Sequence, residues 1–149
     1  MNFDLTQEHE LIKKNAKEFA DKELLPGVLE RDENKIWPKE QIKKMAEMGF
    51  MGMMVDPKWG GSGMDPISYA IAMEQISRVD ASAAVVMSVN NSLVCTLIEK
   101  YGNDYQKEKY LKLLAAGKKI GAFSLSEPQS GSDASNMKTF AEKKDGFYI

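Results

Sequence analysis

The sequence is poor in the residues that build disulfide frameworks, metal centres and nucleic-acid surfaces. Its 149 residues include one cysteine and one histidine, so no internal disulfide can form, and His9 has no second histidine or cysteine at ligand spacing. We therefore expect His9 to be a surface residue and predict no metal site. All basic residues except Arg31 and Arg78 are lysines mixed with acids. This distribution gives no basic stripe for a nucleic-acid backbone, and any anion site must use backbone N–H groups, hydroxyls or lysines.

Long apolar runs are missing as well. The longest, residues 83–87, is far shorter than a bilayer, and the N-terminus has no apolar segment of the kind that directs secretion. Together with the single cysteine, this predicts a cytoplasmic protein without a membrane span. Hydrophobic residues make up 43% and charged residues 28% of the chain, which is typical of an ordinary folded domain.

Capping residues and glycine stops divide residues 6–117 into five predicted helices. Four residues that favour N-caps precede segments with helical spacing of apolar side chains: Thr6, Asp65, Asp80 and Asn103. The remaining helix, the second, opens at Pro38. Three glycines follow such segments as expected for helix ends: Gly49, Gly102 and Gly117. Leu11 and Ile12 belong to the apolar stripe of the first helix, and Ile67 and Ile71 lie on one face of the third.

The fourth predicted helix is apolar or small on every face. Residues 81–98 carry no charge, which predicts a central, buried helix. Asn90 and Asn91 interrupt this apolar surface, and burying either amide without a partner costs roughly 1 to 3 kcal/mol. We therefore expect these side chains to bond each other, a neighbouring backbone segment or a group in a cavity. Residues 50–65 form an apolar, glycine-rich loop, whose methionines are expected to fill gaps in the core rather than to line a pocket.

After residue 117 the pattern changes from helical to strand-like. Residues 120–126 and 138–143 alternate between apolar and polar or small side chains, residues 144–146 suit a hairpin turn, and residues 147–149 begin a third strand. The fold class is therefore α+β, with an up-and-down helical domain at residues 1–117 followed by the first strands of a β-barrel-like domain at 118–149. Because the third strand has no partner, we expect the chain to be truncated inside that β domain.

Between the first two predicted strands lies a turn crowded with hydroxyls, residues 124–135. Hydroxyls and the backbone N–H groups around Gly131 suit a phosphate or the edge of a flavin where arginine is lacking. Turn chemistry alone favours a simpler alternative, in which the serines, Glu127 and Asp133 satisfy the turn's own N–H groups. We expect neither carboxylate to be catalytic.

These residues also carry a family resemblance. Residues 121–134 (GAFSLSEPQSGSDA) resemble the flavin-binding signature of the acyl-CoA dehydrogenases. Residues 5–6, 23–26, 30–32, 60–63 and 88–93 resemble that family's N-terminal segments in the same order, especially those of its short-chain, butyryl-CoA-like members. The resemblance spans the whole chain but covers only the helical domain and the opening of the middle β domain of the family's protein. Gln129, Ser130 and Asn136 depart from the small residues usual at their positions.

The resemblance implies a binding site for FAD and for part of the substrate. Ser126 would bond the edge of the isoalloxazine ring, Gly131 would let the backbone approach the pyrophosphate, and Ser132 would bond that phosphate near the CoA portion of the substrate. Asn90 and Asn91 would line the acyl pocket, with a polar network inside the helical domain as an equal alternative. The implied FAD-binding residues are Phe123, Ser124, Leu125, Ser126, Glu127, Pro128, Gln129, Ser130, Gly131 and Ser132.

The resemblance also implies an activity. Members of the family are oxidoreductases of fatty acid β-oxidation, in which a carboxylate removes the α proton of an acyl-CoA and the β hydrogen passes as hydride to flavin N5. The product is the trans-2-enoyl-CoA, the electrons pass to an electron-transfer flavoprotein, and the family's enzymes are tetramers. The family's catalytic glutamate lies in a C-terminal helical domain and has no counterpart in these 149 residues. We therefore assign no catalytic residue and expect the chain alone to be inactive.

Two other functions are compatible with the same sequence. One is a non-catalytic helical interaction module that keeps the scaffold and has lost the chemistry. The other is a related enzyme, an acyl-CoA oxidase or a nitroalkane oxidase, because these share the N-terminal architecture.

Overall fold

The computed structural model describes residues 4–149, so residues 1–3 of the predicted helical domain lie outside the described residues. Three long helices form from consecutive segments. The first comprises α1 (Gln7–Phe19) and the π-helical turn η1 (Ala20–Leu24). The second, which is central, comprises α5 (Ala81–Ser88), the π-helical η4 (Val89–Cys95) and α6 (Thr96–Tyr101). The last comprises α7 (Asp104–Gln106), η5 (Lys107–Leu111) and α8 (Lys112–Ala115).

Other helices and turns lie between these three. They are α2 (Val28–Glu33), α3 (Lys39–Glu47), the 3₁₀ turns η2 (Phe50–Gly52) and η3 (Pro57–Trp59), and α4 (Pro66–Ser77). Beyond the helical domain lie the 3₁₀ turn η6 (Ala134–Asn136) and a two-stranded hairpin of β1 (Lys143–Lys144) and β2 (Phe147–Tyr148).

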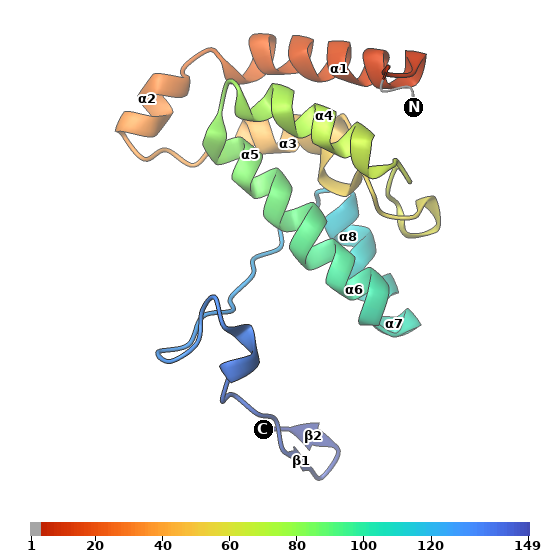
Figure 1. Cartoon of the computed structure of the whole chain (residues 1–149), viewed down its shortest axis with the longest axis vertical. Helices are drawn as coiled ribbons and strands as arrows, with labels where there is room; N and C mark the ends of the chain where they lie inside the picture. The colour runs from red at the N-terminus through yellow and green to blue at the C-terminus, as the bar shows by residue number, and fades with distance from the viewer. Residues whose placement is uncertain (1–3) are drawn as a thin grey trace.

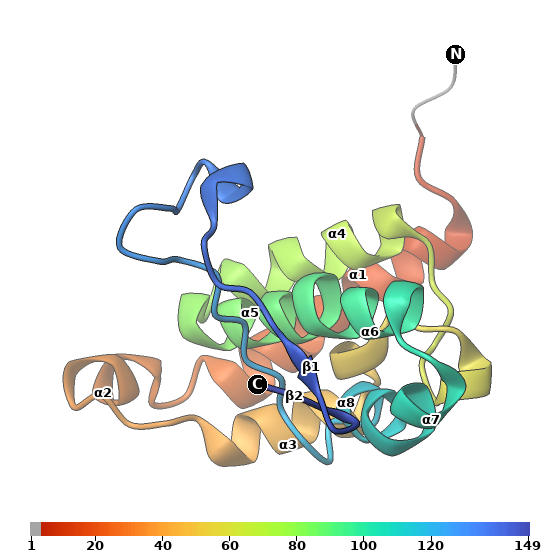
Figure 2. The ribbon, with the colours of Figure 1, turned by 90° about the horizontal axis from the view of Figure 1, so that it is seen from below.

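The helices pack as a bundle around one main core. In Figure 1, α4 lies between α1 and the long α5–α6 helix, and Figure 2 shows the same three helices side by side. The core joins residues of α1, α3, η2, α4 and α5, and Phe19 of α1 meets Phe50 of η2 edge to face, with ring centroids 5.5 Å apart. A second cluster packs Cys95 of the central helix and Leu111 of the last helix against Trp59. The predicted helical domain is thus confirmed as a fold.

The predicted helix starts are confirmed as well. Four side chains accept the expected N-cap bonds: Thr6, Asp65, Asp80 and Asn103. Two apolar members of the predicted helix faces are not part of the core, since Leu11 is 57% and Ile67 55% exposed. α1 buries a single face through Ile12, next to Leu11, whereas α4 turns the small Ser68 and Ala72 inward between its two neighbours. Ile67 lies in the first turn of α4 and projects outward.

Residues 118–149 form less sheet than the alternation predicted. Residues 120–126 are extended but pair with no strand in the described chain, and only the β1–β2 ladder forms, with Lys143 opposite Tyr148 and Lys144 opposite Phe147. A strand needs the backbone groups of a neighbour, so alternation alone could not make strands of residues 120–126 or of residues 138–142. The hairpin turn itself is confirmed: Asp145 (φ 49°) and Gly146 (φ 85°) both adopt the left-handed conformation of a type I′ turn.

The sequence analysis judged the possibility of a membrane span from the apolar run at residues 83–87, but the whole central helix is much longer than that run. Its 21 residues from Ala81 to Tyr101 have a mean hydropathy of 1.6, so by length and composition alone this helix could cross a membrane. One such helix is weak evidence, because the core helix of a soluble bundle meets the same criteria. Here the helix packs against α4 and α8, and its two asparagines bond to backbone groups of neighbouring segments.

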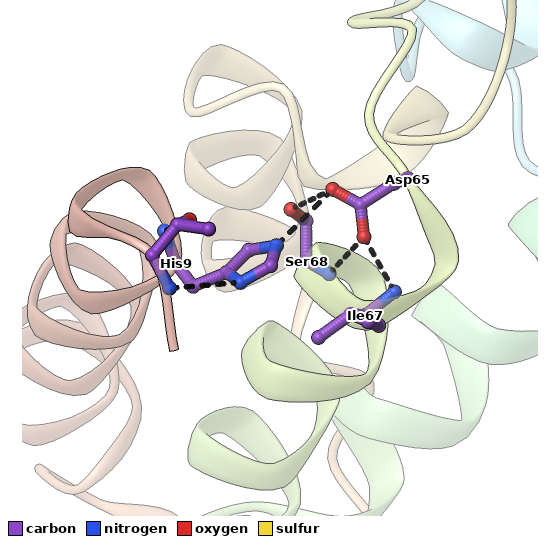
Figure 3. Close-up of polar contacts among 5 residues, drawn as sticks. His9, Asp65, Ile67 and Ser68 are labelled. Carbon is purple, nitrogen blue, oxygen red and sulfur yellow. Dashed lines mark hydrogen bonds and ion pairs between the residues drawn. The ribbon is translucent and has the colours of Figure 1, made fainter. Parts of the chain in front are cut away.

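His9 joins the tips of two helices instead of lying on the surface as predicted, since only 13% of its side chain is exposed. Its Nδ1 accepts from the backbone N–H of Thr6 (3.4 Å), and its Nε2 lies 3.3 Å from Oδ2 of Asp65 (Figure 3). Asp65 also accepts from the hydroxyl of Ser68 (2.7 Å) and from two backbone N–H groups at the start of α4. These bonds, with those from Ser68 the largest cause, hold the pKa of the Asp65 carboxyl well below its usual range.

We expect acid to weaken this junction through Asp65. Because the folded-state pKa of Asp65 lies below its ordinary value of 3.8, its contribution to stability is complete above that pH and is lost as the pH falls below it. Asp65→Asn keeps an N-cap acceptor but cannot titrate. Below about pH 4, unfolding of the wild type should therefore take up more protons than unfolding of Asp65→Asn, by up to about one proton per molecule. The pH dependence of the free energy of unfolding in urea measures this difference, and equal slopes for the two proteins would contradict it.

Candidate functional site

The hydroxyl-rich turn is closed by its own backbone. Glu127 and Ser130 exchange two N–H···O bonds of 2.7 and 3.1 Å, which form a short antiparallel bridge. Ser130 is buried in this bridge, and its hydroxyl donates to the carbonyl of Asp133 (2.7 Å). The turn therefore holds its shape without a neighbouring strand.

Glu127 fastens the far end of the turn. Its carboxylate accepts from the backbone N–H groups of Lys138 (2.8 Å) and Thr139 (3.1 Å) and from the side-chain amide of Gln129. These bonds, the one from Lys138 first, lower the pKa of Glu127 to about 2. Asp133 accepts from the hydroxyl of Ser135 in the same loop. Glu127 thus accepts backbone N–H groups as predicted, although they belong to residues just beyond the turn, whereas Asp133 accepts a hydroxyl instead of an N–H group.

The groups that remain point outward. The hydroxyls of Ser126 and Ser132 are exposed and make no hydrogen bond within residues 4–149. A Cβ built on Gly131 would lie 3.8 Å from the Ser126 hydroxyl oxygen, so the bridge brings this hydroxyl beside the glycine backbone. Phe123 and Leu125, just before the turn, expose apolar side chains. This arrangement offers hydroxyls, open glycine backbone and apolar surface together, which suits a ligand with a flat ring and an anionic group.

Neither arginine is available to this site. Arg31 donates from Nη2 to Oδ2 of Asp80 (3.0 Å) and to the carbonyl of Leu24, and from Nη1 to the carbonyl of Pro26; its side chain is 12% exposed beside the buried Asp80. Arg78 pairs with Asp21 on the outside of the helical domain. An anion at the turn would therefore depend on backbone N–H groups and hydroxyls, as the sequence predicted.

Asn90 and Asn91 lie in the centre of the helical domain and are at most 1% exposed. Asn90 donates to the carbonyls of Met51 (2.8 Å) and Leu114 (3.1 Å), whereas Asn91 donates to those of Phe50 (2.8 Å) and Met87 (2.9 Å). Both amides are used in full by the chain itself. The structure thus shows the polar network that the sequence offered as one alternative, and direct contact of these residues with substrate stays a prediction.

The π-helical turn that carries the two asparagines was not predicted. Its backbone hydrogen bonds join residues five apart instead of four, and both asparagines within it are buried. Two hydroxyls accompany it: Ser92 donates to the carbonyl of Ser88 (2.6 Å) and Thr96 to that of Asn91 (3.0 Å). The cluster of Asn, Ser and Thr within an apolar helix was the one sequence signal that could have indicated it.

The helical domain also contains the methionines of the loop at residues 50–65 and an apolar groove. Met51 and Met53 are buried in the main core, as expected of gap-filling methionines, whereas Met54 is half-buried. An apolar groove of about 870 Å³ lies between α2 and the start of α5. Leu29, Trp37 and Val85 line it, and the sequence analysis did not anticipate it.

The chain is similar to known proteins over its whole length. A family model described as acyl-CoA dehydrogenase, N-terminal domain, matches residues 6–118. The short-chain specific acyl-CoA dehydrogenase of Clostridium acetobutylicum is 41% identical over 149 residues, which are 100% of this chain and 39% of that relative. The chain thus spans about two fifths of the length of the curated relatives it matches.

Two solved structures share the fold and the sequence. Butyryl-CoA dehydrogenase from Megasphaera elsdenii matches with a TM-score of 0.89 and 41% identity, over 99% of this chain and 40% of that one. A chain in a structure named for the electron transferring flavoprotein of Acidaminococcus fermentans matches with a TM-score of 0.94 and 44% identity, over 100% of this chain and 39% of that one. The resemblance deduced from the sequence is confirmed.

The two arginines provide a matched test of burial. Arg31→Ala leaves the buried Asp80 carboxylate without its cation and should cost about 3 kcal/mol of unfolding free energy. Arg78→Ala breaks a pair whose side chains are both well exposed, so it should cost much less. Urea denaturation of both variants measures the difference. A similar loss for the two would show that the Arg31–Asp80 pair is not the buried link described above.

Glu127 should titrate far below an ordinary glutamate. By ¹³C NMR, its carboxyl should remain mostly ionised at about pH 3, because its folded-state pKa is about 2 instead of 4.5. As it protonates, the amide shifts of Lys138 and Thr139 should move, because their acceptor loses its charge. In Glu127→Gln these two shifts should not follow that titration. A midpoint near 4.5 would mean that the turn is open in solution.

Proposed function

Because this chain belongs to the acyl-CoA dehydrogenase family, we propose that it supplies the helical and flavin-binding N-terminal part of an FAD-dependent oxidoreductase. The proposed substrate is a short-chain acyl-CoA and the product its trans-2-enoyl-CoA. The observation that carries the proposal is the turn at residues 126–132, which is closed by the two backbone bonds between Glu127 and Ser130 and leaves the hydroxyls of Ser126 and Ser132 and the backbone of Gly131 exposed. FAD, when bound, would accept the β hydrogen of the substrate as hydride at its N5 atom.

The residues of the turn fit that cofactor. Ser126 would hydrogen-bond the polar edge of the ring, while Phe123 and Leu125 offer apolar surface to its face. Ser132 would donate to a phosphate oxygen, and Gly131 adds no side chain that would keep the phosphate from the backbone. Glu127 and Ser130 would act as the frame of the site, because their polar atoms are already engaged inside the turn.

The chain supports binding more directly than turnover. Removal of the α proton needs a carboxylate within hydrogen-bond reach of the substrate. Glu127, which follows Ser126, is held by two backbone N–H groups and has a pKa of about 2, which makes it a poor base near neutral pH. Asp133, which follows Ser132, accepts from the hydroxyl of Ser135 inside the loop. We propose that the base comes from residues outside these 149 and that the chain alone binds without turning over.

The names of the relatives favour short acyl chains and a flavoprotein partner. The Clostridium acetobutylicum relative is short-chain specific, and the Megasphaera elsdenii structure is a butyryl-CoA dehydrogenase. The Acidaminococcus fermentans structure is named for an electron transferring flavoprotein, which supports such a protein as electron acceptor. The apolar groove beside Leu29 and Trp37 is suited to contact with further protein in a homo-oligomer, proposed to be a tetramer. A cytoplasmic location for the whole remains part of the proposal.

Flavin retention tests the proposal. After incubation with FAD and removal of free ligand, the chain should show flavin absorbance, alone or together with the remaining C-terminal portion of the Clostridium acetobutylicum relative. Ser126→Ala with Ser132→Ala removes two hydrogen bonds and should weaken FAD binding by about 10- to 100-fold. Ser135→Ala, whose hydroxyl is engaged by Asp133 inside the loop, is the matched control and should bind as wild type.

Two outcomes would overturn this assignment. Flavin retained equally by the double variant would place the cofactor elsewhere. No flavin in either preparation would favour a helical interaction module that keeps the scaffold without the chemistry.

A further inference from the structure

The segment that carries the turn is tied to the helical domain at one place. Within the described residues, every hydrogen bond made by residues 122–149 stays inside that segment. The last bond to the helical domain is donated by the backbone N–H of Gly121 to Oδ1 of Asn90, at 2.8 Å. Figure 1 shows the chain leaving the bundle beside the central helix and continuing away from it.

The orientation of the Asn90 amide is fixed from three sides. Its nitrogen donates to the carbonyls of Met51 and Leu114, which can only accept. The amide oxygen must then face the opposite way, where it accepts from Gly121. One buried side chain therefore connects the loop before α4, the last helix and the start of the segment that leads to the turn.

Gly121 also lies against the central helix one turn beyond Asn90. A Cβ at this position would lie 2.7 to 2.9 Å from three side-chain carbons of Val94. Only glycine allows the backbone to come close enough for its N–H to reach the buried amide. The close packing and the hydrogen bond are independent observations that fix the same point of the chain.

We propose that Asn90 is a positioning residue for the flavin-binding turn. Ser126 follows Gly121 by five residues, so the place where Gly121 is held sets where the hydroxyls of the turn begin. Asn90 acts through Gly121, and its own polar atoms are all engaged by the chain. The role in flavin binding rests on the proposed function, whereas the role in placing residues 122–132 does not.

Asn91 supplies the matched control. It is as deeply buried as Asn90 and accepts from the backbone N–H of Met53 (2.8 Å) while donating to two carbonyls. None of its bonds reaches residues 118–149. Replacing either asparagine by alanine should therefore cause a similar loss of stability, but only one replacement should release Gly121.

The first measurement needs no flavin. Spin labels on Glu47→Cys and Lys138→Cys, both exposed positions, report the distance between the helical domain and the far side of the turn. The native Cys95 is buried, and burial raises the pKa of its thiol to about 12, so it should not be labelled. We expect Asn90→Ala to broaden the distance distribution and Asn91→Ala to leave it as in wild type.

The second measurement is FAD affinity in the preparation that retains flavin. Asn90→Ala should weaken binding by about tenfold, and Asn91→Ala by less than about twofold, at equal loss of thermal stability. Gly121→Ala disturbs the same contact from the other side. It should also weaken binding by about tenfold, and it replaces Asn90→Ala in the test if Asn90→Ala does not fold.

The outcomes separate the two proposals. If wild type retains no flavin, the proposed function fails, and the distance distributions still decide whether Asn90 positions the segment. Equal distributions for Asn90→Ala, Gly121→Ala and Asn91→Ala would overturn the positioning role even where wild type binds flavin.

Discussion

The arrangement of this helical domain depends on the need to satisfy two amides buried in an apolar helix. Each of them, left unbonded, would cost roughly 1 to 3 kcal/mol, which is a large part of the stability of a small domain. Neither can be satisfied by its own helix alone, so each requires partners from elsewhere in the chain. The carbonyls of Phe50 and Met51 and the N–H of Met53 meet this need, which holds the irregular loop against the helix. Leu114 meets it on the other side and fixes the last helix.

The close approach of these segments is possible because small residues stand where they cross. A Cβ on Gly52 would lie 2.6 Å from the carbonyl oxygen of Ala115, so the loop and the last helix meet with nothing between them. Gly121 meets the central helix at Val94 in the same way. The amides of Asn90 and Asn91 thus bond to backbone groups that side chains would otherwise hold out of reach. Packing and hydrogen bonding depend on each other here, because either one alone would leave a cavity or an unpaired polar group.

The parts that the sequence predicted well are those decided by neighbouring residues. N-caps at Thr6, Asp65 and Asp80 depend on a side chain and an N–H two or three residues away, so local chemistry is enough. The buried face of α4 and the pairing of residues 120–126 depend on which segment lies alongside, and spacing alone carried no such information. His9 shows the same limit, because its partner Asp65 is 56 residues away. For the site, the sequence indicated which hydroxyls to consider, but not that Ser130 would be buried in the bridge to Glu127 while Ser126 and Ser132 stay exposed.

A chain with only two arginines, both engaged elsewhere, can still offer a site for an anionic cofactor. Both arginines form ion pairs within the helical domain, and Arg31 pairs with the buried Asp80, whose carboxylate also caps the start of the central helix. The turn then has to present neutral donors, and neutral donors bind an anion well only when they are held in place beforehand. The bridge between Glu127 and Ser130 holds the turn in shape, and the bond from Gly121 to Asn90 holds it in position. Binding by such a turn therefore depends on residues that never touch the ligand, since order in the frame substitutes for charge at the site.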